Sequence, residues 1–228
     1  MIIQIYAMVS LDDARRMAEL GVDHIGFLVG EKEGNTVISR DLAKRICEAL
    51  PNKTKVMMPI LDLMMPMRDL TKKIIELAKE IKPDILHISS ESFGVEELEE
   101  IKRALPEIKL MRSIAVDDED AIECAAEIER FCDYFLLDSP GEPLRVKGYI
   151  GSTGKPHDWS ISREIVKNSS IPVILSGGLS PENVGEAIRT VKPDGVDACT
   201  SLDMNSEGRK DVEKVREFIE NARKEEVE

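Results

Sequence analysis

Two consecutive glycines follow a short apolar run in the last quarter of the chain and could bind an anion. The run ends at Leu175 and Ser176, Gly177 and Gly178 come next, and a helix is expected to begin at Pro181. Glycine lets backbone N–H groups approach an oxyanion closely, and a helix N-terminus adds the positive end of its dipole. We therefore predict that Gly177 and Gly178 bind phosphate. The alternative is a tight turn that needs glycine for its shape alone.

A second cluster of small polar residues follows the next apolar run. Cys199, Thr200 and Ser201 come directly after Val196-Asp197-Ala198. Their hydroxyl and N–H groups could contribute to the same phosphate site, or they could form an ordinary polar strand end.

A long connection begins at Asp138, which ends the apolar run Phe135–Leu137. A carboxyl group at such an edge can have a raised pKa and act as a general acid; the alternative is that Asp138 caps its own loop. The segment up to Trp159 is far longer than most strand-to-helix connections, and such loops are usually functional. It could close over a ligand and exclude water. Its glycines and lysines are Lys147, Gly148, Gly151, Gly154 and Lys155.

Apolar runs and amphipathic stretches alternate along the whole chain. The runs are typical of strands buried on both faces, and capping residues such as Ser10 and Ser39 mark helix starts. Eight strands are expected, at Ile2–Met8, His24–Val29, Lys55–Ile60, Asp84–Ile88, Lys109–Ile114, Asp133–Asp138, Pro172–Ser176 and Gly195–Cys199. Eight helices are expected, at Leu11–Leu20, Arg40–Leu50, Pro66–Ile81, Gly94–Leu105, Asp118–Arg130, Trp159–Asn168, from Pro181 onward, and at Asp211–Lys224.

Strict alternation requires parallel strands joined by right-handed crossovers. Eight such units close into a (β/α)8 barrel, a fold of the α/β class, and the 228 residues suffice for one such domain over 1–228. An open doubly wound sheet is the alternative. In a barrel, the active site lies at the C-terminal ends of the strands, and phosphate often sits after the seventh and eighth. Arg112, near the end of the fifth strand, could reach this face to pair with Asp138 or contact a substrate, or it could form a salt bridge inside the barrel.

The composition narrows the classes of partner. The formal net charge is −13, so nucleic acid and anionic membranes are not expected to bind. The four cysteines form no C-x-x-C pair, and no signal peptide or membrane-spanning run is visible. We therefore expect a cytoplasmic protein that binds a phosphorylated small molecule. His, Asp and Glu show no metal-ligand spacing, so neither a metal nor a cofactor is expected.

Several segments together resemble the phosphoribosylanthranilate isomerase family of tryptophan biosynthesis. Gly21–Phe27 is similar to its Gly-Ala-Asp-x-Ile-Gly-Phe, and Gly151–Trp159 to its Gly-Gly-Thr-Gly-x-x-Phe-Asp-Trp. Leu175–Val184 nearly matches Leu-Ser-Gly-Gly-Leu-x-Pro-Glu-Asn-Val, and Gly208–Asp211 resembles Gly-x-Lys-Asp. The resemblance covers nearly the whole chain.

The resemblance implies an Amadori rearrangement, in which an acid opens the ribosyl ring to an imine and a base removes the C2′ proton. It makes Asp138 the acid, and Gly177, Gly178 and Cys199–Ser201 the phosphate site. Residues Gly151, Thr153 and Gly154 are then candidates for substrate binding. Some relatives form pairs, so a homodimer is a further expectation.

Some residues depart from the family pattern. Tyr6 stands where the family has its cysteine base, and a tyrosine with a pKa of roughly 10 is a poor base. Tyr6 could instead fill space and bond to Asp138 or water. His87 could replace the base, or be a neutral structural histidine. Asn35 or Thr36 stands where the family has a substrate-binding arginine, and Gln4 replaces an interior lysine beside Asp197.

Three functions therefore remain open on the sequence. The chain could be an isomerase of this type with an altered base. It could instead be a paralogue that acts on another phosphorylated sugar or amine, or a non-catalytic binder of a phosphorylated metabolite.

Overall fold

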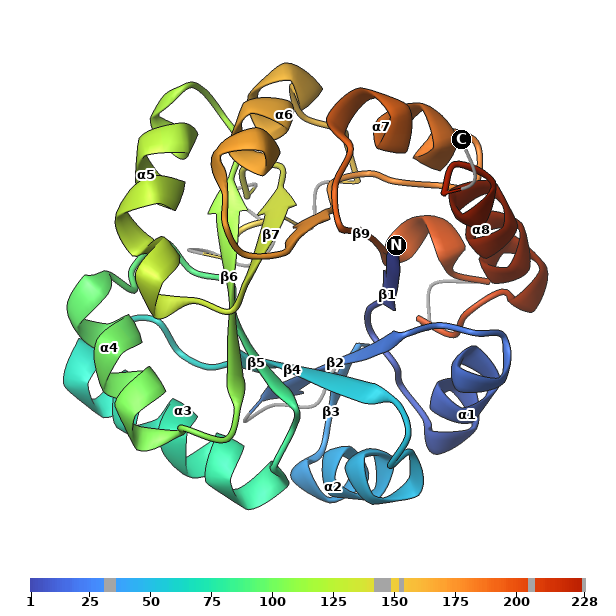
Figure 1. Ribbon diagram of the computed structural model, residues 1–228. Helices are drawn as coiled ribbons and strands as arrows, with labels where there is room; N and C mark the ends of the chain where they lie inside the picture. The colour runs from blue at the N-terminus through green and yellow to red at the C-terminus, as the bar shows by residue number, and fades with distance from the viewer. Residues whose placement is uncertain (31–35, 142–148, 152–153, 205–207, 227–228) are drawn as a thin grey trace.

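Eight parallel strands form a closed ring surrounded by helices (Figure 1). The computed structural model describes residues 1–30, 36–141, 149–151, 154–204 and 208–226. Backbone pairing of Gln4 with His24 and of Ile5 with Ile25 joins the strand Ile2–Ile5 to the strand His24–Gly30 and closes the barrel. Around the ring the strands are β1 (Ile2–Ile5), β9 (Gly195–Ala198), β8 (Val173–Leu175), β7 (Tyr134–Asp138), β6 (Lys109–Ala115), β5 (Ile85–Ile88), β4 (Thr54–Ile60) and β2 (His24–Gly30).

Helices follow the ring strands and cover the outside of the barrel (Figure 1). Ser10 and Ser39 cap the first two as expected, because their hydroxyl oxygens accept hydrogen bonds from the N–H groups of Asp13 and Leu42. Within the described residues the α-helices are α1 (Leu11–Glu19), α2 (Arg40–Ala49), α3 (Met67–Ile81), α4 (Val95–Ala104), α5 (Asp120–Ile128), α6 (Trp159–Asn168), α7 (Val184–Val191) and α8 (Val212–Lys224).

The predicted (β/α)8 barrel is confirmed, and the structure adds details that the sequence did not predict. A short strand β3 (Val37–Ile38), which the sequence did not predict, pairs with the end of β2. The helix expected from Pro181 starts only at Val184. The reason is the side chain of Asn183, which accepts a hydrogen bond from the Ser180 N–H and donates one to the Gly178 carbonyl. These bonds hold the preceding residues in a turn.

The core has two layers because successive strand residues point to opposite faces. A large cluster fills the space between the strands and the helices. A smaller cluster fills the inside of the barrel, and its buried members are Tyr6, Val56, Ile85, Met111, Leu136 and Ile174. The barrel is therefore packed and not a pore, and ligands must bind at the ends of the strands.

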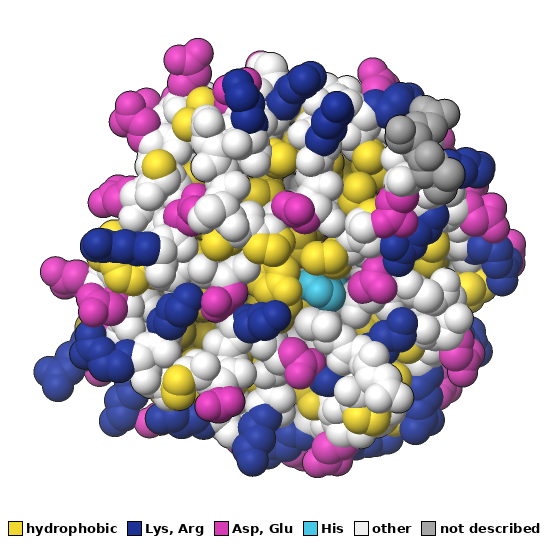
Figure 2. Space-filling model, viewed as in Figure 1, with side chains coloured by type: hydrophobic (Ala, Val, Ile, Leu, Met, Phe, Trp, Pro, Cys, Tyr) yellow, Lys and Arg dark blue, Asp and Glu magenta, His cyan; other side chains and the backbone are white. Residues whose placement is uncertain are grey.

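The surface carries charges of both signs. Figure 2 shows acidic and basic side chains interspersed over one face, with hydrophobic side chains near its centre. In the part of the chain that the structure describes, no helix has the length and apolar character needed to cross a bilayer.

Candidate active site

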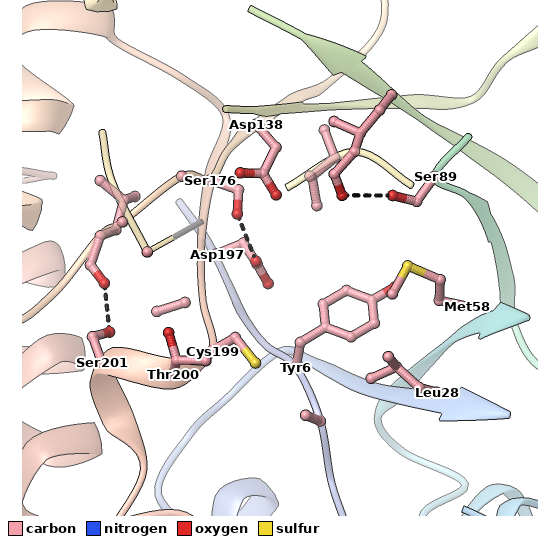
Figure 3. A pocket seen from close by; sticks show the side chains of 18 of the residues that line it. Tyr6, Leu28, Met58, Ser89, Asp138, Ser176, Asp197, Cys199, Thr200 and Ser201 are labelled. Carbon is pink, nitrogen blue, oxygen red and sulfur yellow. Dashed lines mark hydrogen bonds between the residues drawn. The ribbon is translucent and has the colours of Figure 1, made fainter. Parts of the chain in front are cut away.

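A cavity of 440 Å³ lies at the C-terminal ends of the strands (Figure 3). Its polar end contains Thr200 and Ser201, and its apolar end contains Leu28 and Met58, with Tyr6 extending across the floor (Figure 3). Other lining residues are Ala7, Thr36, His87, Ser89, Leu136, Asp138, Ile150, Gly154, Ser176, Gly177, Gly178, Leu179, Asp197, Ala198 and Cys199. The cavity thus offers polar groups at one end and an apolar surface at the other.

Asp138 ends β7 and faces the cavity. Burial raises the pKa of its carboxyl group to about 7, although the N–H that Ser139 donates to Oδ1 at 2.7 Å opposes this shift. Gly151 covers the carboxyl group so closely that a Cβ atom there would lie 2.1 Å from Oδ2. A carboxyl group with a pKa near neutrality can hold a proton for transfer at pH 7.

Asp197 on β9 is a second carboxyl group in the cavity. It is 4% exposed, and its Oδ2 accepts a hydrogen bond of 2.9 Å from the Ser176 hydroxyl. Its Oδ1 has no hydrogen-bond partner among the described residues. Burial raises the pKa of Asp197 to about 6, against hydrogen bonding from Ser176 and Gln4, and the charge of Asp197 in turn raises the pKa of Asp138.

Tyr6 and His87 form a buried chain of hydrogen bonds. The Tyr6 hydroxyl lies 2.6 Å from His87 Nδ1, and His87 Nε2 lies 2.7 Å from the Ser113 hydroxyl. Burial lowers the pKa of His87 to about 3 and raises that of Tyr6 well above its ordinary value. Both side chains are therefore neutral near pH 7. The Tyr6 hydroxyl thus bonds to His87 and not to Asp138, the protein partner that was expected.

Gly177 and Gly178 form the turn after β8 with φ angles of 84° and 62°. Such angles favour glycine. Among the backbone hydrogen bonds of the described residues, none has the N–H of Gly177 or Gly178 as its donor. Gly154 and Thr200 line the same end of the cavity. These groups offer unpaired N–H donors and a hydroxyl to an anion.

The other predicted phosphate residues surround this turn. The Ser201 hydroxyl donates to the Leu179 carbonyl at 2.5 Å and so joins the two strand ends. Buried Lys210 donates to the Cys199 carbonyl at 3.1 Å and to Asp203 at 2.5 Å. Lys210 therefore fixes the backbone at Cys199.

Arg112 does not reach this cavity. Its neighbour Met111 packs inside the barrel, so alternation turns Arg112 outward. It lines a separate cavity beside α4 and α5, where it donates to the Ser113 carbonyl at 2.5 Å. The prediction that Arg112 meets Asp138 was wrong, because its strand position gives it the opposite orientation.

Two glycines of the long loop lie at the cavity, as the sequence predicted for substrate-binding residues. Gly151 covers Asp138, while Gly154 lines the cavity. Thr153 and Asn35 lie outside the described residues. Sequence reasoning gave Asp197 no role in the chemistry, although its position two residues before Cys199 indicates an inward orientation. In the part of the chain that is described, no group of three or more His, Cys, Asp or Glu residues could hold a metal ion.

Comparisons with known proteins agree with the sequence motifs. The family model for N-(5′-phosphoribosyl)anthranilate isomerase matches residues 67–221. Isomerase 2 and isomerase 1 of Methanosarcina mazei are 36% and 33% identical to the chain, with 97% of the chain and 93% and 94% of each relative covered.

Solved structures of the same enzyme are also similar. The phosphoribosyl anthranilate isomerase of Thermotoga maritima has a TM-score of 0.80 and 26% identity over 98% of this chain and all of that one. A structure in complex with reduced 1-(o-carboxyphenylamino)-1-deoxyribulose 5-phosphate has a TM-score of 0.77 at the same identity and coverage. The chain therefore belongs to the N-(5′-phosphoribosyl)anthranilate isomerase family.

Proposed function

We propose that the protein isomerises N-(5′-phosphoribosyl)anthranilate to 1-(o-carboxyphenylamino)-1-deoxyribulose 5-phosphate in tryptophan biosynthesis. The observation that carries this proposal is the position of Asp138. Its carboxyl group, with a pKa of about 7, faces the same cavity as the unpaired N–H groups of Gly177 and Gly178. A proton donor and an anion site in one cavity are what an acid-catalysed ring opening of a phosphorylated sugar requires.

The two ends of the cavity match the two ends of this substrate. The polar end, with Gly177, Gly178 and Thr200, suits the phosphate group. The apolar end, with Leu28 and Met58, suits an aromatic ring (Figure 3). Because Asp138 lies between them, the ribosyl ring would be held beside the acid.

Asp138 acts as the general acid in this proposal. It donates its proton to the ring oxygen O4′ while the C1′–O4′ bond breaks, which leaves a protonated imine at C1′. The proton at C2′ then becomes acidic, and its removal leads to the ketose. The reaction is an isomerisation, so it needs no oxidant or reductant.

The test is the loss of the fluorescence of phosphoribosylanthranilate on addition of the purified protein. We expect turnover by the natural chain and a loss of kcat of about 10²–10⁴-fold in Asp138→Asn. Absence of turnover by the natural chain, combined with phosphate-competitive binding of another metabolite, would contradict the proposal in favour of a paralogue or a binder.

We also propose a cellular location and an oligomeric state for the enzyme. We place it in the cytoplasm with the other enzymes of amino-acid biosynthesis. The isomerase of T. maritima is described as dimeric, and we propose a homodimer here as well. Sedimentation equilibrium tests this, and a monomer mass would contradict it.

A further inference from the structure

We propose that Asp197 is the general base that removes the C2′ proton, an inference that rests on the isomerisation proposed above. The position in the cavity, the unpartnered oxygen and the lack of another suitable base in the cavity support this role.

The Asp197 carboxylate has a fixed position in the cavity. Asp197 lies on β9 beside Ser176. Its carboxylate points into the cavity between Asp138 and Tyr6 (Figure 3). Its Oδ2 is held by the Ser176 hydroxyl, so the carboxylate has a fixed orientation. Its Oδ1 is buried without a partner among the described residues. A buried carboxylate oxygen without a hydrogen-bond donor costs free energy, and a catalytic role is one reason for which native structures retain such a group.

The charged groups around Asp197 leave its carboxylate without an ion-pair partner among the described residues. Gln4, its register partner on β1, is uncharged, although its side chain also lowers the pKa of Asp197, and the cavity also holds Asp138 on β7 and Tyr6 at the end of β1. Lys210 is the cation that lowers the pKa of Asp197, but its ammonium group donates to Asp203 and to the Cys199 carbonyl. In the described ranges no ion pair includes Asp197, so the carboxylate keeps its basicity.

The other ionisable side chains of the cavity are poorly suited to act as the base. The ionisable side chains among the described lining residues are Tyr6, His87, Asp138, Asp197 and Cys199. Tyr6 and His87 bond to each other, and the second nitrogen of His87 is bonded to Ser113. Burial raises the pKa of Cys199 to about 11, although Lys210 opposes the shift, so the thiol is protonated near neutrality. Asp138 holds the proton that opens the ring, which leaves Asp197.

The proton transfers balance. Asp138 gives its proton to O4′ as the C1′–O4′ bond breaks. Asp197 takes the C2′ proton, the C2′–H electron pair forms a C1′–C2′ double bond, and the C=N electron pair moves to nitrogen to give an enolamine. Asp197 then returns its proton to C1′ while the enol hydroxyl at C2′ loses its proton to Asp138. The ketose forms, and both carboxyl groups regain their starting states.

The test compares Asp197→Asn and Asp197→Ala with the natural chain. We expect kcat to fall by about 10²–10⁴-fold in both, while binding of the reduced product analogue, measured by calorimetry, stays within about threefold. Added formate or acetate should restore part of the activity of Asp197→Ala, and the rescued rate should show a primary isotope effect with substrate deuterated at C2′. A purely structural residue would not respond to the added carboxylate. As a matched control, the exposed Asp12→Asn on α1 should leave kcat unchanged.

A second variant covers the case in which both Asp197 variants fail to fold. The Ser176 hydrogen bond lowers the pKa of both Asp197 and Asp138. Ser176→Ala should therefore move both limbs of the kcat/KM pH profile to higher pH. An acidic limb that stays in place would overturn the base role of Asp197.

The outcomes separate this inference from the proposed function. A natural chain without turnover removes the proposed function itself. Turnover that is lost in Asp138→Asn but retained above about a tenth in Asp197→Asn overturns only the role of Asp197. Rescue by carboxylates in Asp197→Ala supports both.

Discussion

A Cβ atom on Gly151 would lie 2.1 Å from Oδ2 of Asp138, so the backbone of the long loop rests directly on this carboxyl group. Gly151 also has a φ angle of 85°, and its N–H donates to the Ser139 carbonyl at 3.0 Å. The loop therefore contributes to the burial that raises the pKa of Asp138. Gly151 acts on the reaction through Asp138 and is a positioning residue.

The first prediction concerns Gly151→Ala. The new methyl group must displace either the loop or the carboxyl group, so we expect kcat to fall by at least about tenfold, since misplaced groups lose effective concentration. The alkaline limb of the pH profile should also move to lower pH as Asp138 becomes more exposed. Gly21→Ala is the matched control, because Gly21 has a φ of 96° but nothing within 4 Å of its added methyl group. Equal losses of activity in both variants would show that backbone strain alone is responsible.

The second prediction is the pH dependence of kcat/KM. The acid Asp138 must be protonated, and burial raises its pKa to about 7. Activity should therefore decline as the pH rises through about 7. If Asp197 is the base, it must be ionised, and activity should also decline as the pH falls through about 6. We expect a narrow bell-shaped profile, and a rate that stays constant up to pH 9 would exclude Asp138 as the acid.

The third prediction concerns stability. The folded-state pKa of Asp138 is raised from 3.8 to about 7. Below pH of about 4 the group is protonated in both states, so its ionisation costs nothing. Between about pH 4 and pH 7 the unfolded state loses the proton more readily, so the free energy of unfolding falls as the pH rises. This decrease is complete above about pH 7. Asp138→Asn should therefore raise the free energy of unfolding at pH 8 by about 1–3 kcal/mol, with little change at pH 4.

Urea unfolding at the two pH values checks this prediction. The exposed Asp12→Asn should change stability by less than about 0.5 kcal/mol at either pH. A destabilised Asp138→Asn at pH 8 would show that the charged carboxylate makes favourable contacts that outweigh its burial.

Local pattern explains which features the sequence could predict. Short apolar runs in strict alternation with amphipathic stretches determine the barrel, and the position of Asp138 at the end of such a run places it at the cavity. The predicted phosphate-binding turn after β8 follows from Gly177 and Gly178 in the same way. Strand parity also fixes the outward orientation of Arg112, but that inference needs the strand register, which only the folded barrel provides.

Contacts between distant segments could not be predicted. Tyr6 and His87 are separated by 81 positions, and their hydrogen bond depends on the width of the barrel at that level. The close approach of Gly151 to Asp138 depends on how the long loop folds back. Whether Oδ1 of Asp197 has a hydrogen-bond donor depends on how all of the surrounding segments pack. These features arise from packing and not from local propensity.

The fourth prediction concerns Tyr6→Phe. Tyr6 is 5% exposed, and loss of its hydroxyl leaves Nδ1 of His87 buried without its partner. We expect the free energy of unfolding to fall by about 1–3 kcal/mol. Because the pKa of Tyr6 is raised well above 10, the residue cannot serve as a base near neutrality, and kcat should fall by less than about tenfold. In the control Tyr134→Phe, the lost hydroxyl is exposed and accepts a long hydrogen bond of 3.4 Å from Lys109, so the effect on stability should be small.

A large loss of kcat in Tyr6→Phe would have a wider consequence. A fall of about 10³-fold with unchanged analogue binding would assign the proton transfer to Tyr6 and contradict the role of Asp197. A loss of stability with nearly normal turnover would assign Tyr6 to the floor of the cavity.

The fifth prediction concerns the turn of Gly177 and Gly178 after β8, the proposed phosphate site. A Cβ atom on Gly178 would lie 2.6 Å from the backbone carbon of Lys155 and 2.7 Å from the nitrogen of Pro156. Gly178→Ala must therefore separate the turn from the loop segment above it and disturb the N–H groups of Gly177 and Gly178, the proposed anion donors. We expect KM to rise by about 10–100-fold, which corresponds to one lost hydrogen bond to a charged group. The effect on kcat should be smaller, because the acid and the proposed base remain in place.

Inhibition by inorganic phosphate separates this effect from a general loss of folding. The natural chain should be inhibited competitively, and the inhibition constant should rise in Gly178→Ala by a factor similar to the rise in KM. Gly21→Ala again serves as the control for a positive φ angle, since it lies at the end of α1, away from the cavity. If phosphate inhibits Gly178→Ala as strongly as the natural chain, the anion binds elsewhere, and the turn after β8 has glycines only because its shape requires them.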